Sequence, residues 1–229
     1  MRRRDFIGLG LSGAALAMFG PRLAAAAGAG QASTPLPKRD TVRVAFVIGM
    51  HANVIDVAGP WEVFQDVTLP GSASPFTLYT VSDSTEVVEM SGGLQVKPNH
   101  AFADAPPPHV IVVPALMGTP ASNAWLQAAS ATADVTTSVC TGAFELARAG
   151  LLDGLPATTH HEFWDSFEAR YPKVQLQRGP RFVDNGRIAT AGGLTSGIDL
   201  ALHIVQRYHG AEVAAATAAY MEHQSDRWQ

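Results

Sequence analysis

Short, almost wholly apolar segments alternate with helix-forming segments along most of this 229-residue chain. Residues 42–48, 76–81 and 110–113 are rich in Val, Ile and other apolar residues, and helical patterns separate or follow them. Strands that are apolar on both faces are typical of a parallel sheet covered by helices on both sides. The sequence therefore predicts an α/β fold with a mainly parallel sheet, which binds ligands at the carboxyl ends of its strands.

The same patterns predict the remaining elements. A helix is expected to open at residues 59–64, further helices to cover 123–131, 144–152, 163–171, 198–207 and 211–222, a strand to cover 135–139, and a hairpin to lie around 183–188. These elements leave room for one domain with a substantial core.

The first 27 residues have the three-part layout of an export signal. Arg2, Arg3 and Arg4 precede a mildly apolar, glycine-containing stretch, and a run of small residues at 23–27 suits cleavage. The arginine cluster favours the twin-arginine route, so we expect a periplasmic or secreted protein. The apolar stretch is too short for a comfortable membrane span, which needs about 20 residues, so no stable membrane anchor is expected after cleavage.

Charge and composition divide the rest of the chain. Residues 28–40, with Pro35 and Pro37 among small residues, are predicted to be a flexible tether, and residues 41–229 to be the domain. Without the four arginines and one aspartate of residues 1–27, the 16 basic and 20 acidic residues of the chain become 12 and 19, a net charge of −7. A domain this acidic has no electrostatic footprint for nucleic acid, so no nucleic-acid partner is expected.

Cys140 is the only cysteine, and it lies where the strand predicted over 135–139 meets the helix predicted over 144–152. A lone thiol cannot form an internal disulfide, and such a strand-to-helix corner resembles the elbow that exposes a nucleophile. Gly142 is small enough to let the helix begin close to the strand. The positive end of the helix favours the thiolate, so a pKa of Cys140 below about 8.5 is expected. The alternative is a buried cysteine that acts as a small hydrophobic residue.

Four segments of the chain form a set of motifs. They are Asp-Val-Ala-Gly-Pro-Trp-Glu-Val-Phe at 56–64, Val-Val-Pro at 112–114, Ser-Val-Cys-Thr-Gly-Ala-Phe at 138–144 with the residues that follow it to 160, and Thr-Ala-Gly-Gly at 190–193 with 196–202. Their order and spacing cover nearly all of residues 41–220. The set resembles the ThiJ/PfpI superfamily, a branch of the flavodoxin-like class I glutamine amidotransferase fold, and in particular its isocyanide (isonitrile) hydratase-like and regulator-like members.

The resemblance implies roles for individual residues. Cys140 matches the elbow nucleophile, and Asp56 matches an acidic residue beside it that passes a proton. Without the resemblance, Asp56 is equally well explained as an acid at a helix N-terminus, and Glu62 is expected to be a solvated or packing residue of that helix. The residues assigned to substrate or oxyanion binding are Ala115, Leu116 and Thr141, and the candidate pocket residues are Gly59, His160 and Gly192.

Two positions depart from the family pattern. In family members, two glycines usually follow Val-Val-Pro, whereas this chain has Ala115 and Leu116 at those positions. The backbone N–H groups are still present, but the side chain of Leu116 adds bulk. Peptidase-like relatives have a histidine directly after the cysteine, and this chain has Thr141 there. The pocket is therefore expected to differ in shape, and His160 or His161 could reach its mouth.

The features together favour an exported, cysteine-dependent hydratase or hydrolase of a small uncharged molecule. The leading reaction is conversion of an isocyanide to an N-substituted formamide, for which the resemblance implies no metal or organic cofactor. Amidase-like or glyoxalase-like chemistry, a non-catalytic thiol sensor or ligand-binding domain, and a transcription regulator are the alternatives. The export signal disfavours the regulator. Relatives commonly form homodimers, and we expect the same here.

Overall fold

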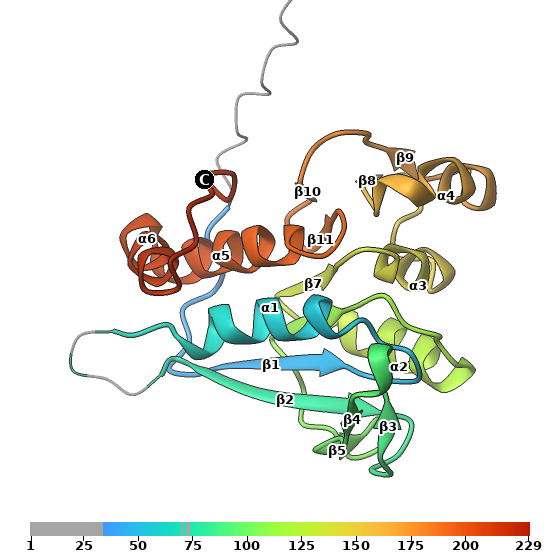
Figure 1. The fold of residues 1–229 in the computed structure, drawn as a ribbon, viewed down its shortest axis with the longest axis horizontal. Helices are drawn as coiled ribbons and strands as arrows, with labels where there is room; N and C mark the ends of the chain where they lie inside the picture. The colour runs from blue at the N-terminus through green and yellow to red at the C-terminus, as the bar shows by residue number, and fades with distance from the viewer. Residues whose placement is uncertain (1–33, 70, 72–73) are drawn as a thin grey trace, which may run out of the picture. The chain divides into compact units, whose positions relative to one another are not determined.

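The computed structural model describes residues 34–69, 71 and 74–229, so the predicted export signal and the first residues of the tether lie outside it. The described residues form a seven-stranded sheet in the order β10-β11-β7-β6-β1-β2-β5 (Figure 1). Every neighbouring pair is parallel except β10 and β11, which form the predicted hairpin. The predicted mainly parallel sheet with helices on both faces is confirmed.

The elements have the following bounds. The strands of the main sheet are β1 (Val42–Val47), β2 (Phe76–Ser82), β5 (His100–Ala101), β6 (Val110–Val113), β7 (Val135–Ser138), β10 (Phe182–Asp184) and β11 (Ile188–Ala191). Two small ribbons pair β3 (Val88–Glu89) with β4 (Gln95–Val96) and β8 (Pro156–Ala157) with β9 (Gln175–Leu176). The helices are α1 (Val54–Gln65), α2 (Pro120–Ser130), α3 (Gly142–Arg148), α4 (Trp164–Arg170), α5 (Ser196–His209) and α6 (Ala211–Tyr220), with 3-10 turns at Ser91–Gly93 and His161–Phe163.

The sheet separates two apolar layers, because successive side chains of a strand point to opposite faces. In β1, Val44 and Phe46 pack into a cluster formed with α1, α5 and α6. Ala45 and Val47 pack into a second cluster, with residues of α2, α3 and α4. Figure 1 shows α1 running along β1, and α5 beside α6. This two-sided burial explains why the central strands are apolar throughout.

Helix α1 begins earlier than the sequence predicted. Its expected start was at residues 59–64, whereas the helix begins at Val54, where the side chain of Asn53 accepts a hydrogen bond of 3.2 Å from the N–H of Ile55. Pro60 consequently lies inside the helix and not in its first turn. The earlier start places Asp56 in the first turn of α1, in contact with Ala115, which follows β6.

The described part of the predicted tether contacts the domain. Residues 34–40 form no helix or strand, but Leu36 is buried and its N–H donates to the carbonyl of Arg207 at 2.9 Å. Arg207 Nε donates in turn to the carbonyl of Thr34 at 3.0 Å. Arg39 forms an ion pair of 2.6 Å with Asp134, just before β7. This part of the segment is therefore packed against α5 and the sheet.

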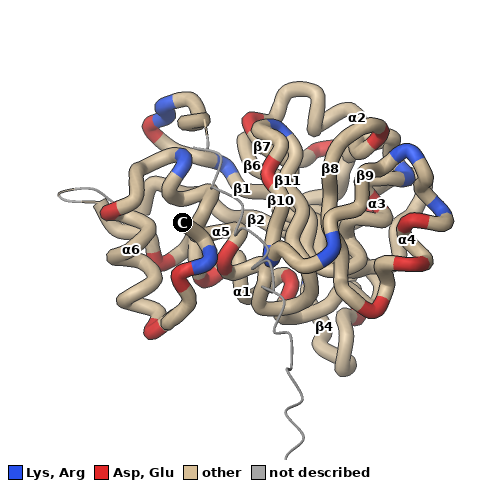
Figure 2. The backbone as a smooth tube through the Cα atoms, turned by 90° about the horizontal axis from the view of Figure 1, so that it is seen from above, with Lys and Arg blue, Asp and Glu red and all other residues tan. Residues whose placement is uncertain are grey.

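Figure 2 shows the Lys, Arg, Asp and Glu residues dispersed along the backbone among other residues, mostly on the outer elements. Within the described residues, no helix combines the length and the apolar character that crossing a membrane requires. Residues 34–69, 71 and 74–229 also contain no group of three His, Cys, Asp or Glu side chains arranged to hold a metal ion.

Candidate active site

Cys140 lies between β7 and α3, with a backbone φ of 58°. This left-handed conformation is rare for a residue other than glycine. The Cys140 N–H donates to the carbonyl of Gly192 at 2.8 Å, and its carbonyl accepts a hydrogen bond of 2.8 Å from the hydroxyl of Thr159. Two neighbouring segments therefore hold the strained elbow from both sides, as expected for a nucleophile elbow.

Gly142 lets α3 begin against the sheet. A Cβ at this position would lie 2.2 Å from the carbonyl oxygen of Val113 and 2.8 Å from that of Pro114. Any side chain would thus push the start of the helix away from the end of β6. The geometry agrees with the role that the sequence predicted for Gly142.

Asp56 is fully buried beside the elbow. Its Oδ2 accepts a hydrogen bond of 3.1 Å from the N–H of Ala115, and its Oδ1 has no partner within hydrogen-bond distance among the described residues. Burial raises the pKa of Asp56 to about 6, and the nearby N–H groups of Ala115 and Leu194 and the thiol of Cys140 oppose this rise. The carboxyl group is consequently ionised at neutral pH and protonated in mild acid.

The thiol of Cys140 is held in its protonated form. Burial, and after it the charge of Asp56, raises the pKa of Cys140 to about 11, against smaller opposing effects of Thr141 and Leu194. The expected pKa below about 8.5 is therefore not what the structure indicates. The expectation considered the start of the helix, but Cys140 is only 7% exposed and faces a like charge. At neutral pH the pair holds one negative charge, on Asp56, and one proton, on Cys140.

Leu194 completes this group of residues, and the sequence did not indicate it. Leu194 has a φ of 54° in the turn between β11 and α5, and its N–H lies beside both Asp56 and Cys140. Only the backbone N–H of Leu194 contacts the site, so the identity of the side chain does not indicate this contact. The available signal was the Gly192-Gly193 pair just before it, where the lack of a Cβ at Gly193 makes room for the ring of His160.

Of the three residues assigned to substrate binding, Ala115 has a different role. Its N–H is bound to Asp56, so it positions the acid and is not available to a substrate as predicted. The N–H of Leu116 makes no hydrogen bond to any residue in the described part of the chain. Thr141 presents its N–H and hydroxyl to the thiol of Cys140. Leu116 and Thr141 remain the candidate donors to a substrate.

The candidate pocket residues lie at different distances from the thiol. Gly192 contacts Cys140 directly through its carbonyl. The ring of His160 packs against Gly193, where a Cβ would come within 2.1 Å of His160 Cδ2. Gly59 instead lets α1 pack against α5, because a Cβ there would lie 2.9 Å from Ile198 Cγ1.

Two other side chains singled out in the sequence lie at the margins. The ring of His161 stacks on that of His160 with 4.5 Å between the ring centroids. Glu62 is exposed and contacts Gln65 at 3.2 Å, as expected for a solvated helix residue. Neither residue contacts the thiol or the Asp56 carboxyl group through a hydrogen bond among the described residues.

A parallel sheet that presents a cysteine at a strand-to-helix elbow, beside a buried carboxyl group, defines a class of cysteine-centred α/β domains. The chain belongs to the DJ-1/PfpI family, whose family model matches residues 42–207.

Relatives of this chain include both an enzyme and regulators. The chain is 31% identical over 189 residues to an isonitrile hydratase of Pseudomonas putida, an alignment that covers 80% of this chain and 78% of the hydratase. It is 28% identical over 187 residues to the HTH-type transcriptional regulator GbdR of Pseudomonas aeruginosa, which covers 80% of this chain but only 51% of the regulator. The chain therefore spans about half the length of that regulator.

Solved structures share the fold of this chain. A ThiJ/PfpI family protein from Pseudomonas syringae has a TM-score of 0.73 at 24% identity, covering 93% of this chain and 83% of that one. An AraC family transcriptional regulator from Pseudomonas putida has a TM-score of 0.67 at 21% identity, covering 79% of this chain and 99% of that one. These likenesses establish the fold, and function must be argued from the site.

Proposed function

We propose that this protein is a cysteine-dependent hydratase that converts a small isocyanide, R–N≡C, and water to an N-substituted formamide, R–NH–CHO. The observation that carries the proposal is the fully buried carboxyl group of Asp56 beside the thiol of Cys140 at the elbow. The similarity to an isonitrile hydratase over 80% of the chain supports the same reaction.

The first half of the reaction forms a bond to sulfur. The sulfur of Cys140 adds to the terminal carbon of the isocyanide while its proton passes to the ionised carboxylate of Asp56. Asp56 then delivers that proton to the same carbon, which gives a thioimidate, R–N=CH–S–Cys. The N–H groups of Thr141 and Leu194 beside the sulfur stabilise the negative charge that develops on it during the transfer.

The second half consumes one water molecule. Water adds its oxygen to the thioimidate carbon, and the nitrogen gains one proton. The C–S bond then breaks as the hydroxyl group becomes the formamide carbonyl, and its proton returns through Asp56 to the sulfur of Cys140. The site is left as it began, with a thiol and a carboxylate.

A ligand-binding domain without catalysis is the second candidate, and the similarity to GbdR favours it. In that case the thiol, which is protonated at neutral pH, would line a binding site or act as a sensor. Amidase-like and glyoxalase-like reactions are the other enzymatic alternatives, because the same thiol could attack a carbonyl carbon.

A substrate panel separates these functions. The purified protein and its Cys140→Ala and Cys140→Ser variants are incubated with isocyanides, amides and 2-oxoaldehydes, and the products are identified by mass spectrometry. The proposal expects formamide from isocyanides, with loss of product in both variants and unchanged melting temperatures. Binding of an isocyanide without turnover would support the ligand-binding candidate, and turnover confined to amides or oxoaldehydes would replace the reaction.

We further propose export by the twin-arginine route and assembly as a homodimer. The arginine cluster at residues 2–4 supports export. Exposed apolar side chains near the carboxyl ends of the strands, Met50, Met117 and Phe163, support a contact between two copies. Sedimentation at the mass of one chain would contradict the dimer.

A further inference from the structure

A cavity lies at the amino ends of β1 and β6, at the end of the sheet opposite to Cys140. It has a volume of about 980 Å³. Arg43, near the start of β1, and His109, just before β6, both line it. The side chains of Lys38, Arg39, Asp40 and His209 contribute to the same walls. Basic and imidazole groups thus gather in one cavity of an otherwise acidic chain, whose formal net charge is −4.

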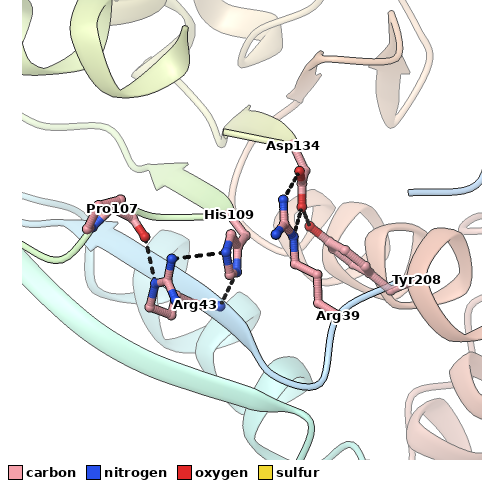
Figure 3. Close-up of polar contacts among 6 residues, drawn as sticks. All are labelled: Arg39, Arg43, Pro107, His109, Asp134 and Tyr208. Atoms are coloured by element: carbon pink, nitrogen blue, oxygen red, sulfur yellow. Dashed lines mark hydrogen bonds and ion pairs between the residues drawn. The ribbon is translucent and has the colours of Figure 1, made fainter. Parts of the chain in front are cut away.

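The cations in this cavity are only partly compensated. Arg39 donates through Nε and Nη2 to the two oxygens of Asp134, each at 2.6 Å, and Asp134 also accepts a hydrogen bond of 2.8 Å from the hydroxyl of Tyr208 (Figure 3). The charge of Arg39 is therefore neutralised. Lys38 and Arg43 form no ion pair with any acid in the described part of the chain, and Asp40 is the one acid among the residues that line the cavity.

The ring of His109 points one hydrogen-bond donor, its Nε2–H group, at another donor, the guanidinium of Arg43. Its Nδ1 accepts a hydrogen bond of 3.0 Å from the backbone N–H of Arg43, and its Nε2 lies 3.0 Å from Arg43 Nη2 (Figure 3). A neutral imidazole has a single acceptor nitrogen, so Nε2 must carry the hydrogen and face the N–H of the guanidinium. Burial and the charge of Arg43 lower the pKa of His109, which keeps the ring neutral. With the residue only 9% exposed, this buried donor has no acceptor among residues 34–69, 71 and 74–229.

We propose that this cavity binds an oxyanion, the phosphate or carboxylate group of a small molecule, between the guanidinium of Arg43 and the Nε2–H of His109. Arg43 Nη2 and His109 Nε2 lie 3.0 Å apart, so an anionic oxygen that binds between them must move the end of the guanidinium away from the ring. The oxygen then accepts a hydrogen bond from each group, and two charge-assisted hydrogen bonds replace the unfavourable donor–donor contact. Lys38 adds attraction from the exposed rim. His209, whose buried Nε2 also lacks a partner among the described residues, lines the same cavity.

Hydrogen bonds hold the backbones of Arg43 and His109, and the Nε of Arg43, in place. The N–H of His109 donates to the carbonyl of Arg43 at 2.9 Å, and the carbonyl of His109 accepts a hydrogen bond of 2.8 Å from the N–H of Asp134. Arg43 Nε donates to the carbonyl of Pro107 at 2.6 Å (Figure 3). Both groups therefore lie on the rigid ends of paired strands, which suits recognition of a fixed charge geometry.

Titration of the purified full chain with inorganic phosphate tests the site. Histidine ring resonances are followed by ¹⁵N NMR, and the affinity is measured by calorimetry. We expect a saturable shift of the His109 resonances, and an affinity about tenfold or more weaker in Arg43→Gln, because bonds to charged groups are the strong ones. Lys38→Gln should weaken it severalfold, whereas Lys97→Gln, which removes the same charge at an exposed position after β4, should leave it unchanged.

Further ligands and variants identify the anion and show which results would overturn the proposal. Methyl phosphate and acetate titrated separately distinguish a phosphate site from a carboxylate site. A response that does not saturate, or equal affinities in wild type, Arg43→Gln and Lys38→Gln, would overturn the proposal. If Arg43→Gln fails to fold after losing its bond to Pro107, Lys38→Gln decides, because the Lys38 side chain is exposed and makes no hydrogen bond within the described residues. Cys140→Ala should bind phosphate normally, so this result is independent of the proposed reaction.

Discussion

At the scale of single residues, the chemistry depends on which of two buried acids, Asp56 and Cys140, holds the proton. We predict that iodoacetamide alkylates Cys140 with an apparent pKa well above the roughly 8.5 of a free cysteine, because burial and the Asp56 charge raise the pKa to about 11. Asp56→Asn removes the neighbouring charge, so alkylation at pH 8 should become faster. Mass spectrometry of the protein alkylated at a series of pH values between 6 and 11 measures the apparent pKa of the wild type and the alkylation rate of the variant. A wild-type thiol that titrates below 8.5 would contradict the arrangement seen here.

Asp56→Asn also tests the proton transfer. The substitution keeps the size of the side chain but removes its titratable proton, so turnover should fall by about 10²–10⁴. Wild-type turnover should rise between pH 5 and 7, because Asp56 becomes an effective base as it ionises near its pKa of about 6. Glu62→Gln is the matched control, since Glu62 lies in the same helix, is exposed and contacts Gln65. Near wild-type turnover in Asp56→Asn would leave His160 or a water molecule as the proton carrier.

Asp56→Asn should lower turnover but raise stability at neutral pH. The pKa of Asp56 is raised in the folded protein from 3.8 to about 6, so its contribution to stability is fully present below about pH 4 and lost as the pH rises through 6. Asp56→Asn should therefore raise the melting temperature at pH 7 more than at pH 4, by the equivalent of about 1–3 kcal/mol. If Asp56 only stabilised the helix end, the variant would lose about 0.3–1 kcal/mol at pH 7 instead.

Residue identity alone could predict part of this site. Cys140, Asp56 and Thr141 could be found because their side chains, or their place beside the cysteine, carry the function. The roles of Ala115 and Leu194 could not, because they act through N–H groups that every non-proline residue has. The pKa of Cys140 was also beyond the sequence, since burial against Asp56 comes from elements 84 residues apart in the chain.

At the scale of elements, backbone strain gathers at one edge of the sheet. Four residues other than glycine have a positive φ in the described part of the chain, and three of them follow strands: His51 follows β1, Cys140 follows β7, and Leu194 lies between β11 and α5, whereas the fourth, Glu222, follows α6. All three lie at the carboxyl ends of parallel strands, where ligands bind in folds of this type. Strained backbone is retained where surrounding structure enforces it, which here includes the bonds from Gly192 and Thr159.

The close start of α3 predicts a strong effect of one methyl group. Gly142→Ala would place a Cβ 2.2 Å from the carbonyl oxygen of Val113, so the helix start must move away from β6. We expect a loss of about 1–3 kcal/mol in stability and reduced turnover, because Thr141 and Cys140 move with the helix. Thermal melting and the hydratase assay measure the two effects. In Gly49→Ala, the matched control, a Cβ meets only a methyl group of Leu116 at 3.3 Å, and an equal loss there would show that the contact with Val113 is not the cause.

Long elements were predictable and short ones were not. The apolar run at 110–113 coincides with β6. All four of its residues are buried, because helices cover both faces of the sheet, so the strand is apolar throughout. The two-residue strands β3, β4, β8 and β9 are too short to leave a pattern, and tertiary contacts alone define them. The start of α1 was predicted near Pro60, but the cap by Asn53 and the packing of Gly59 against α5 extend the helix back to Val54.

At the scale of the whole domain, the C-terminal residues are tied to the layer that carries the active-site turn. Asp199 of α5 is fully buried, pairs with Arg181 and accepts a hydrogen bond of 2.8 Å from His223. His203, also on α5, contacts Asp184 of β10 at 2.9 Å and the carbonyl of Trp228 at 3.1 Å. Because α5 begins at Ser196, two residues after Leu194, these contacts hold the turn beside Cys140 in place.

The last prediction concerns the proposed export of the whole protein by the twin-arginine route. Replacing Arg2, Arg3 and Arg4 together with Lys should retain the precursor there, because the twin-arginine route recognises guanidinium groups and not charge alone. That route carries folded proteins, so the thiol of Cys140, only 7% exposed in the folded domain, would already be enclosed on reaching an oxidising compartment. Cell fractionation measures precursor and processed protein, with Arg22→Lys, outside the cluster, as the matched control. Undiminished export of the triple variant would remove this route and with it the explanation of how a single reactive thiol arrives unmodified.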